Sequence, residues 1–181
     1  MCLEINSYYH NTHTGSDTPI ALIAKRDLIA FKFIMPQPGW QHPGPTRYVT
    51  PFQRDVVMIG QMYTAAFGLD WQCASPIFPS PRWTVSEGLH AFTNLQKACL
   101  EDFVPVMVII PKGTKYYIGC NDDVVAETLV YKKVLIDDQR PCPSSTRARW
   151  NESVDIYRYA YKQIKWLKLF HPRKFRVIPR A

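Results

Sequence analysis

The fold is decided by residues 86–131, which read SEGLHAFTNLQKACLEDFVPVMVIIPKGTKYYIGCNDDVVAETLVY. Within this stretch, Val104–Ile110 is the strongest strand signal, because it is a run of apolar, largely β-branched residues. It ends at the turn Pro111–Gly113, and Lys115–Ile118 follows as an edge strand. A Glu87-Gly88 turn opens the stretch. Strands joined by such short turns are typical of antiparallel sheet.

Further strands are predicted on both sides of this stretch. Apolar or alternating runs indicate strands at Leu28–Ile34, Asp55–Ile59 and Leu129–Ile136, and a short strand carries His90 and Phe92. Clusters of proline separate the runs and mark loops. No regular alternation of strands and long helices is seen, which excludes a parallel βαβ sheet.

Two helices are expected. The first spans Asn94–Phe103, with Asn94 or Thr93 as its N-cap, because apolar residues recur at helical spacing. The second runs from about Glu152 to Phe170 and is ended by Pro172. The predicted fold class is therefore α+β: a curved, mainly antiparallel sheet, one short central helix and a longer basic amphipathic C-terminal helix. Residues 1–138 form the body, and residues 139–181 are an appendage of the same domain.

Composition narrows the class of protein. With 181 residues, 46% hydrophobic and 20% charged, the chain is expected to fold as one globular domain. It has no apolar run long enough to span a membrane, and MCLEINSYYH lacks the features of a secretory signal. A location in the cytoplasm of a bacterial host, or association with a virion, is expected. Scattered cysteines without C-x-x-C predict no metal site, and His10 and His13 are interpreted as surface residues.

The charge is concentrated near the C-terminus. The chain has a net charge of +7, but residues 139–181 carry +9 and residues 1–138 carry −2. At helical spacing the cations share one face, which residues after the helix prolong: Arg158, Lys162, Lys165 and Lys168, then Arg173, Lys174 and Arg176. Three interpretations stay open. The face is simply solvated, it contacts a phosphate backbone, or it docks on an acidic protein or membrane surface.

The central stretch resembles an uncharacterised protein family of bacteriophages and gut bacteria. The likeness lies in residues 87–92 (EGLHAF), Ala98 and residues 110–119 (IPKGTKYYIG), with MCL at 1–3, IAKRD at 23–27 and TPF at 50–52. It covers about residues 1–136 and leaves out the basic segment. The resemblance implies a phage or mobile-element accessory protein and brings no named activity. Together with the basic face, it predicts a non-enzymatic binding or assembly module without a cofactor, whose partner is a protein, a virion component or nucleic acid.

A weaker likeness is to the ADP-ribosyltransferase fold. Phe92-Thr93, Ala98, the turn at 111–113 and Glu127 follow in the order of that family's motifs. The resemblance implies an enzyme that uses NAD, with Glu127 as catalytic carboxylate and His90 and Thr93 in the site. The chain differs from the family's pattern in having Phe92-Thr93-Asn94 where a Ser-Thr-Ser motif is expected. Without this activity, Glu127 is a solvent-facing strand residue and His90 packs against Phe92.

Cys2 is a separate candidate. If Met1 is removed, Cys2 becomes an N-terminal nucleophile whose own α-amine can serve as base. The other interpretation is an ordinary buried or flexible cysteine.

Overall fold

A computed structural model describes residues 3–10, 18–37, 47–51, 53–66, 68–75, 82–98, 103–135, 161–162 and 176–177. The elements in chain order are β1 (Leu3–Glu4), α1 (Ser7–His10), β2 (Leu22–Ile23), β3 (Leu28–Pro36), β4 (Tyr48–Val49), β5 (Val56–Val57), β6 (Met62–Thr64), β7 (Trp71–Ser75), β8 (Arg82–Val85), β9 (Leu89–Phe92), α2 (Leu95–Ala98), β10 (Val104–Ile110), β11 (Lys115–Ile118), β12 (Asp123–Ala126), β13 (Thr128–Val134) and β14 (Arg176–Val177).

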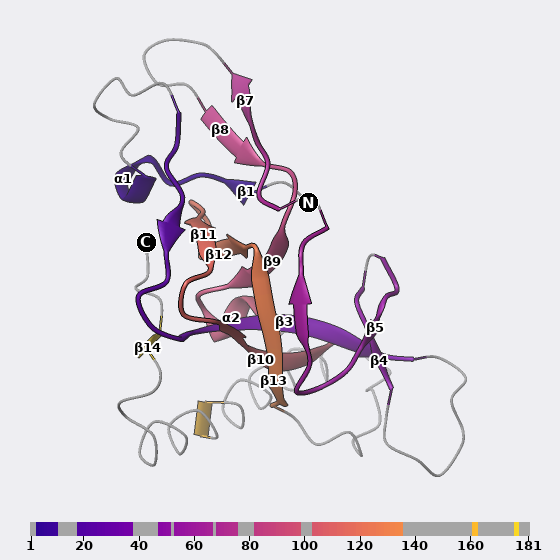
Figure 1. The fold of residues 1–181 in the computed structure, drawn as a ribbon. Helices are drawn as coiled ribbons and strands as arrows, with labels where there is room; N and C mark the ends of the chain where they lie inside the picture. Colours follow the sequence, from indigo (N-terminus) through magenta and orange to yellow (C-terminus); the bar gives the residue numbers. More distant parts are fainter. Residues whose placement is uncertain are drawn as a thin grey trace.

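Most of these strands form one large sheet. Its main path runs in the order β2-β11-β12-β9-β3-β10-β13-β6, and every pairing along this path is antiparallel. A smaller antiparallel sheet, β1-β8-β7, lies at one end of the molecule, and the β4–β5 hairpin lies away from it (Figure 1). The predicted α+β class, with a mainly antiparallel sheet and a short central helix, is confirmed.

The long strands β3 and β10 form the middle of the sheet. They pair over seven residues, from Val104 opposite Ile34 to Ile110 opposite Leu28. Apart from Lys32 in β3, both strands are apolar along their length, because both faces of the sheet are covered here. A register shift between Met107 and Val108 interrupts the pairing of β10 with β13, and such a bulge bends a sheet.

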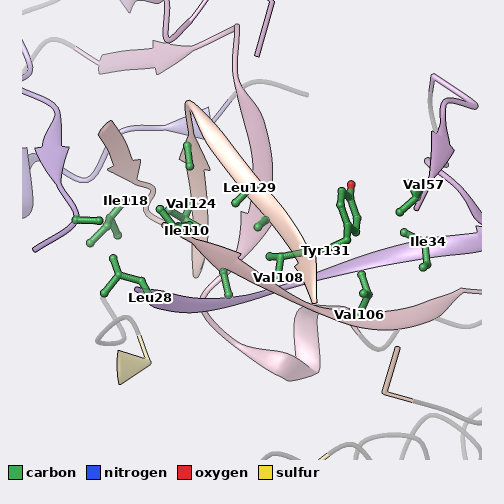
Figure 2. Close-up of a cluster of buried hydrophobic side chains, with 14 of the residues drawn as sticks. Leu28, Ile34, Val57, Val106, Val108, Ile110, Ile118, Val124, Leu129 and Tyr131 are labelled. Carbon is green, nitrogen blue, oxygen red and sulfur yellow. The ribbon is translucent and has the colours of Figure 1, made fainter. Parts of the chain in front are cut away.

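Alternation along β3 separates two hydrophobic clusters. Leu28, Ala30 and Ile34 face the larger cluster, which Figure 2 shows with side chains from β10, β12 and β13 gathered around it. Ile29 and Phe31 face the opposite side, where α2 covers the sheet. Helix α2 begins at its predicted cap, because the Asn94 side-chain oxygen accepts a hydrogen bond from the Gln96 amide at 3.0 Å.

The sequence placed some elements wrongly. Lys115–Ile118 was expected at an edge, but β11 lies between β2 and β12. The two-residue strand β2 is too short to show a periodic pattern, so its addition outside β11 depends on tertiary contacts. The central helix was expected to reach Phe103, whereas Phe103 leads directly into β10 and is not helical. Residues 99–102 lie outside the described residues.

The C-terminal segment is described at two points. Tyr161 and Lys162 are helical and exposed, while the rest of the predicted basic helix lies outside the described residues. Strand β14 pairs in parallel with β3, with Arg176 opposite Leu28, so this part of the appendage joins the sheet of the body. In the described part of the chain no helix is long and apolar enough to cross a membrane.

Candidate functional site

A pocket lies at the β2 end of the large sheet. It encloses about 340 Å³ and is lined by residues of β2 and the segment before it, of β11, and of two turns: Ile20, Ala21, Ile23, Leu69, Lys115, Tyr117 and Glu127. Six of these were not singled out by the sequence, whereas Glu127 was. We refer to this site as the β2 pocket.

Backbone pairing brings Glu127 and Lys115 together. Tyr116 is paired with Ala126 across β11 and β12, and the Glu127 amide then donates to the Lys115 carbonyl at 3.0 Å. Residues directly opposite on antiparallel strands project from the same face. Both side chains therefore rise beside Tyr117 at the wall of the pocket. Within the described residues neither Lys115 nor Glu127 forms an ion pair.

His10 holds one wall of the pocket in place. Its Nδ1 donates to the Ile20 carbonyl at 2.9 Å, and its Nε2 accepts from the Ile118 amide at 2.8 Å. The imidazole is only 1% exposed and packs against Tyr117, whose hydroxyl donates to the Pro19 carbonyl at 3.3 Å. The interpretation of His10 as a surface histidine was wrong. It is a buried link between the segment before β2 and strand β11.

This link predicts a pH dependence of stability. Burial lowers the pKa of His10, so the folded protein binds this proton less well than the unfolded chain does. The contribution of neutral His10 to the free energy of unfolding is therefore fully present above pH 6.5, the ordinary pKa of histidine. It is lost as the pH falls below that value. We expect His10→Ala to flatten the fall in unfolding free energy between pH 6.5 and 5 by up to about 1.4 kcal/mol per pH unit. Urea unfolding at several pH values measures this, and identical slopes in both proteins would contradict it.

Gly88 lets the opposite wall approach the sheet. A Cβ on Gly88 would overlap the Val125 Cγ1 and would lie 2.8 Å from the Leu69 Cδ2, and the φ of Gly88 is +127°. Leu69 therefore packs on the sheet only because residue 88 has no side chain. Since Leu69 lines the β2 pocket, Gly88 determines the position of that wall.

The residues implied by the ADP-ribosyltransferase likeness are only partly brought together. His90 is opposite Val125, so Glu127 is its diagonal neighbour on the same face, about 7–8 Å away. Burial, reinforced by the charge of Lys32, lowers the pKa of His90 to about 4, which keeps the ring neutral. Thr93 does not join them. It is buried, and its hydroxyl donates to the Asp122 carbonyl at 3.2 Å, which ties it to the β11–β12 turn.

The other predicted site residues lie mostly outside the described part. Cys2 and the basic residues Arg158, Lys165, Lys168, Arg173 and Lys174 are outside it, while Lys162 is exposed and the backbone of Arg176 belongs to β14. Among the described residues no cluster of His, Cys, Asp and Glu is arranged to hold a metal ion.

A second surface lies at the other end of the sheet. Four large apolar side chains within seven residues are between 42% and 60% exposed: Val56, Met58, Ile59 and Met62. They come from β5, the following turn and β6, and β6 ends the main path of the sheet with β13 on its one described side. We call these four residues the apolar edge. Scattered apolar residues are normal on a surface, but a contiguous group marks an interaction site.

Aromatic residues connect the apolar edge to the core. The Tyr63 hydroxyl accepts from the Met58 amide at 2.8 Å and donates to the Val56 carbonyl at 3.3 Å, which fixes the shape of the turn. The Tyr63 ring packs edge-on against Tyr131, their centroids 5.2 Å apart. Tyr131 is buried beside Val57 and Ile34 (Figure 2). The apolar edge is therefore tied to the core through Tyr63.

The sequence did not single out the apolar edge. The run Val56-Val57-Met58-Ile59 has the composition of a buried strand, and exposure of such a run depends on which elements cover it.

Comparison with protein families, with curated proteins and with solved structures finds no match for this chain.

Proposed function

We propose that the protein is a non-enzymatic binding module, a phage or mobile-element accessory protein, that docks an extended segment of a partner protein on its apolar edge. The exposure of Val56, Met58, Ile59 and Met62 beside the terminal strand β6 carries this proposal. A strand at the end of a sheet offers backbone donors and acceptors to an incoming strand. Methionine side chains adapt to varied apolar partners, which suits a docking surface.

The charges beside the apolar edge favour an acidic partner. Arg54 precedes β5, and Lys132 and Lys133 are on β13, the strand paired with β6; all three are exposed. Among the described residues 53–62 and 128–134, Asp55 is the single exposed carboxylate. An extended segment with apolar side chains and acidic flanks would be attracted to this surface. The cationic face of the C-terminal segment, carried by Arg158, Lys162, Lys165 and Lys168, would add attraction to the same partner.

A synthetic peptide tests the proposal. The probe is a labelled peptide of about ten residues whose centre alternates valine and threonine and whose ends are glutamates. We expect the protein to bind it, and Met62→Lys to weaken binding at least about ten-fold, because a charge replaces an apolar contact at the pairing strand. Fluorescence polarisation measures the affinity, and Lys97→Glu, on α2, is the control expected to leave it unchanged.

Two further peptides make the test specific. N-methylation of alternate amides removes the donors that strand pairing needs, so it should abolish binding. Replacement of the terminal glutamates by lysines should weaken it, and more so at low salt. Absence of binding by the parent peptide, or equal binding of the N-methylated form, would refute docking by strand pairing.

A further inference from the structure

We propose that the β2 pocket binds a small zwitterion, an α-amino acid with an apolar side chain. This site is made of other residues than the apolar edge, because none of the side chains that line the pocket is Val56, Met58, Ile59 or Met62. The proposal rests on two opposite charges that lie side by side without neutralising each other, and on an uncovered apolar wall next to them.

The two charges are at the right spacing for an amino-acid head group. Lys115 and Glu127 are direct cross-strand partners, so their Cβ atoms are about 5 Å apart. Opposite charges at such positions commonly pair with each other, but these two form no ion pair within the described part of the chain. An α-amino acid carries its ammonium and carboxylate on one carbon. Its ammonium can therefore meet Glu127 while its carboxylate meets Lys115.

The rest of the pocket is suited to an apolar side chain. Ile20, Ala21, Ile23 and Leu69 supply apolar surface beside the two charges, and Ile20 and Ile23 are each 59% exposed. A ligand side chain that covered them would remove this surface from water, which stabilises the complex by about 25 cal/mol per Å² buried. A volume of about 340 Å³ lies at the small end of the range for small-molecule pockets.

Among the described residues that line the pocket, Tyr117 also carries a polar side-chain group, and this group is already engaged. The Tyr117 hydroxyl donates to the Pro19 carbonyl, and His10 holds the neighbouring Ile20 carbonyl. These bonds fix the wall and leave the recognition of charge to Lys115 and Glu127. Removal of either partner charge from the ligand should therefore be as harmful as removal of its counterpart from the protein.

Calorimetric titration with L-leucine tests the site. We expect leucine to bind, and 3-methylbutylamine, 4-methylpentanoate and 6-aminohexanoate to bind at least about ten-fold more weakly, because each lacks a charge or separates the two. Lys115→Met and Glu127→Gln should each cause a similar loss, while Lys112→Met, on the exposed turn before β11, should not. Glutamine has the shape of glutamate, and methionine is one atom shorter than lysine, so both substitutions remove the charge with little change in volume. Circular dichroism verifies that the variants fold.

Three outcomes would overturn the proposal. No heat with leucine, valine or phenylalanine would show that apolar zwitterions do not bind. Equal binding of leucine and the amine or acid analogues would show that charge pairing does not determine recognition. Tighter binding of NAD than of leucine, in competition for the same site, would assign the pocket to a dinucleotide. None of these outcomes affects binding of the strand peptide at the apolar edge, so the two proposals fail separately.

Discussion

Replacement of Gly88 by alanine is expected to lower the free energy of unfolding by about 3 kcal/mol. Two effects add at this position. The backbone has a φ of +127°, which residues with a side chain rarely adopt, and the new methyl group would overlap Val125 and Leu69. Val125 is fully buried and has no space into which to move, so the strand β9 or the segment carrying Leu69 must shift. Denaturant unfolding of the two proteins measures the difference.

Gly113→Ala is the matched control for this effect. Gly113 also has a positive φ, +89°, but a Cβ there meets nothing within 4 Å. This variant should therefore show the backbone strain alone, about 1 kcal/mol. If Gly88→Ala is no more destabilising than Gly113→Ala, close packing of Leu69 on the sheet is not what requires glycine at position 88. Because Leu69 lines the β2 pocket, Gly88→Ala should also change leucine binding, whereas Gly113→Ala should not.

Replacement of Lys32 by methionine is expected to stabilise the protein by about 2 kcal/mol at pH 7. Lys32 alternates with Ala30 and Ile34 along β3, so it points into the larger hydrophobic cluster. Burial lowers its pKa from 10.5 to about 8, which means that the charged amine is disfavoured in the fold by about 3 kcal/mol. Methionine removes this cost. It also removes the contact of the Lys32 ammonium with the Tyr131 ring, whose centroid is 5.9 Å away; this contact stabilises the fold by about 1 kcal/mol.

The pH dependence of the stability difference shows whether the charge of Lys32 causes it. Since the pKa of Lys32 is lower in the folded protein, the unfolded chain binds the proton more tightly, and the cost is fully present below about pH 8. It disappears above 10.5, where the amine is neutral in both states. The advantage of Lys32→Met should therefore shrink as the pH rises through this window. Lys132→Met, at an exposed position of β13, should change stability by less than about 0.5 kcal/mol. A Lys32→Met protein that is less stable at pH 7 would show that the charge has a compensating partner.

The long strands and the central helix cap were predictable from the sequence, for a physical reason. Val104–Ile110 is apolar throughout, and Leu28–Ile34 is apolar except for Lys32, because both faces of these strands are covered. A long apolar run of this kind can be recognised without tertiary information. Strands β2, β4 and β14 contain two residues each, which is too few for any periodic signal. They are strands because a longer neighbour offers them hydrogen bonds.

In the candidate sites too, local patterns were predictable from the sequence and long-range contacts were not. Glu127 was singled out because the order of motifs resembles that of the ADP-ribosyltransferase fold, but its pairing with Lys115 depends on the register of β11 and β12. His10 seemed to lie in a turn, and its burial depends on contacts with Ile118, which is 108 residues away in the sequence. Side chains that meet through long-range register are not visible in local sequence patterns.

The pairing of β3 with β10 also determines how the chain must fold. These central strands are separated by more than sixty residues, and β3 receives β14 from almost the end of the sequence. Joining such distant segments requires closure of long loops. The chain loses this conformational entropy before the apolar contacts form, which slows folding into the millisecond-to-second range. During synthesis, β3 leaves the ribosome long before either partner does. Met35 and Pro36 can pair early with β4, but the newly made chain must hold the rest of this mostly apolar strand without β10 and β14. In that interval the chain is most exposed to aggregation.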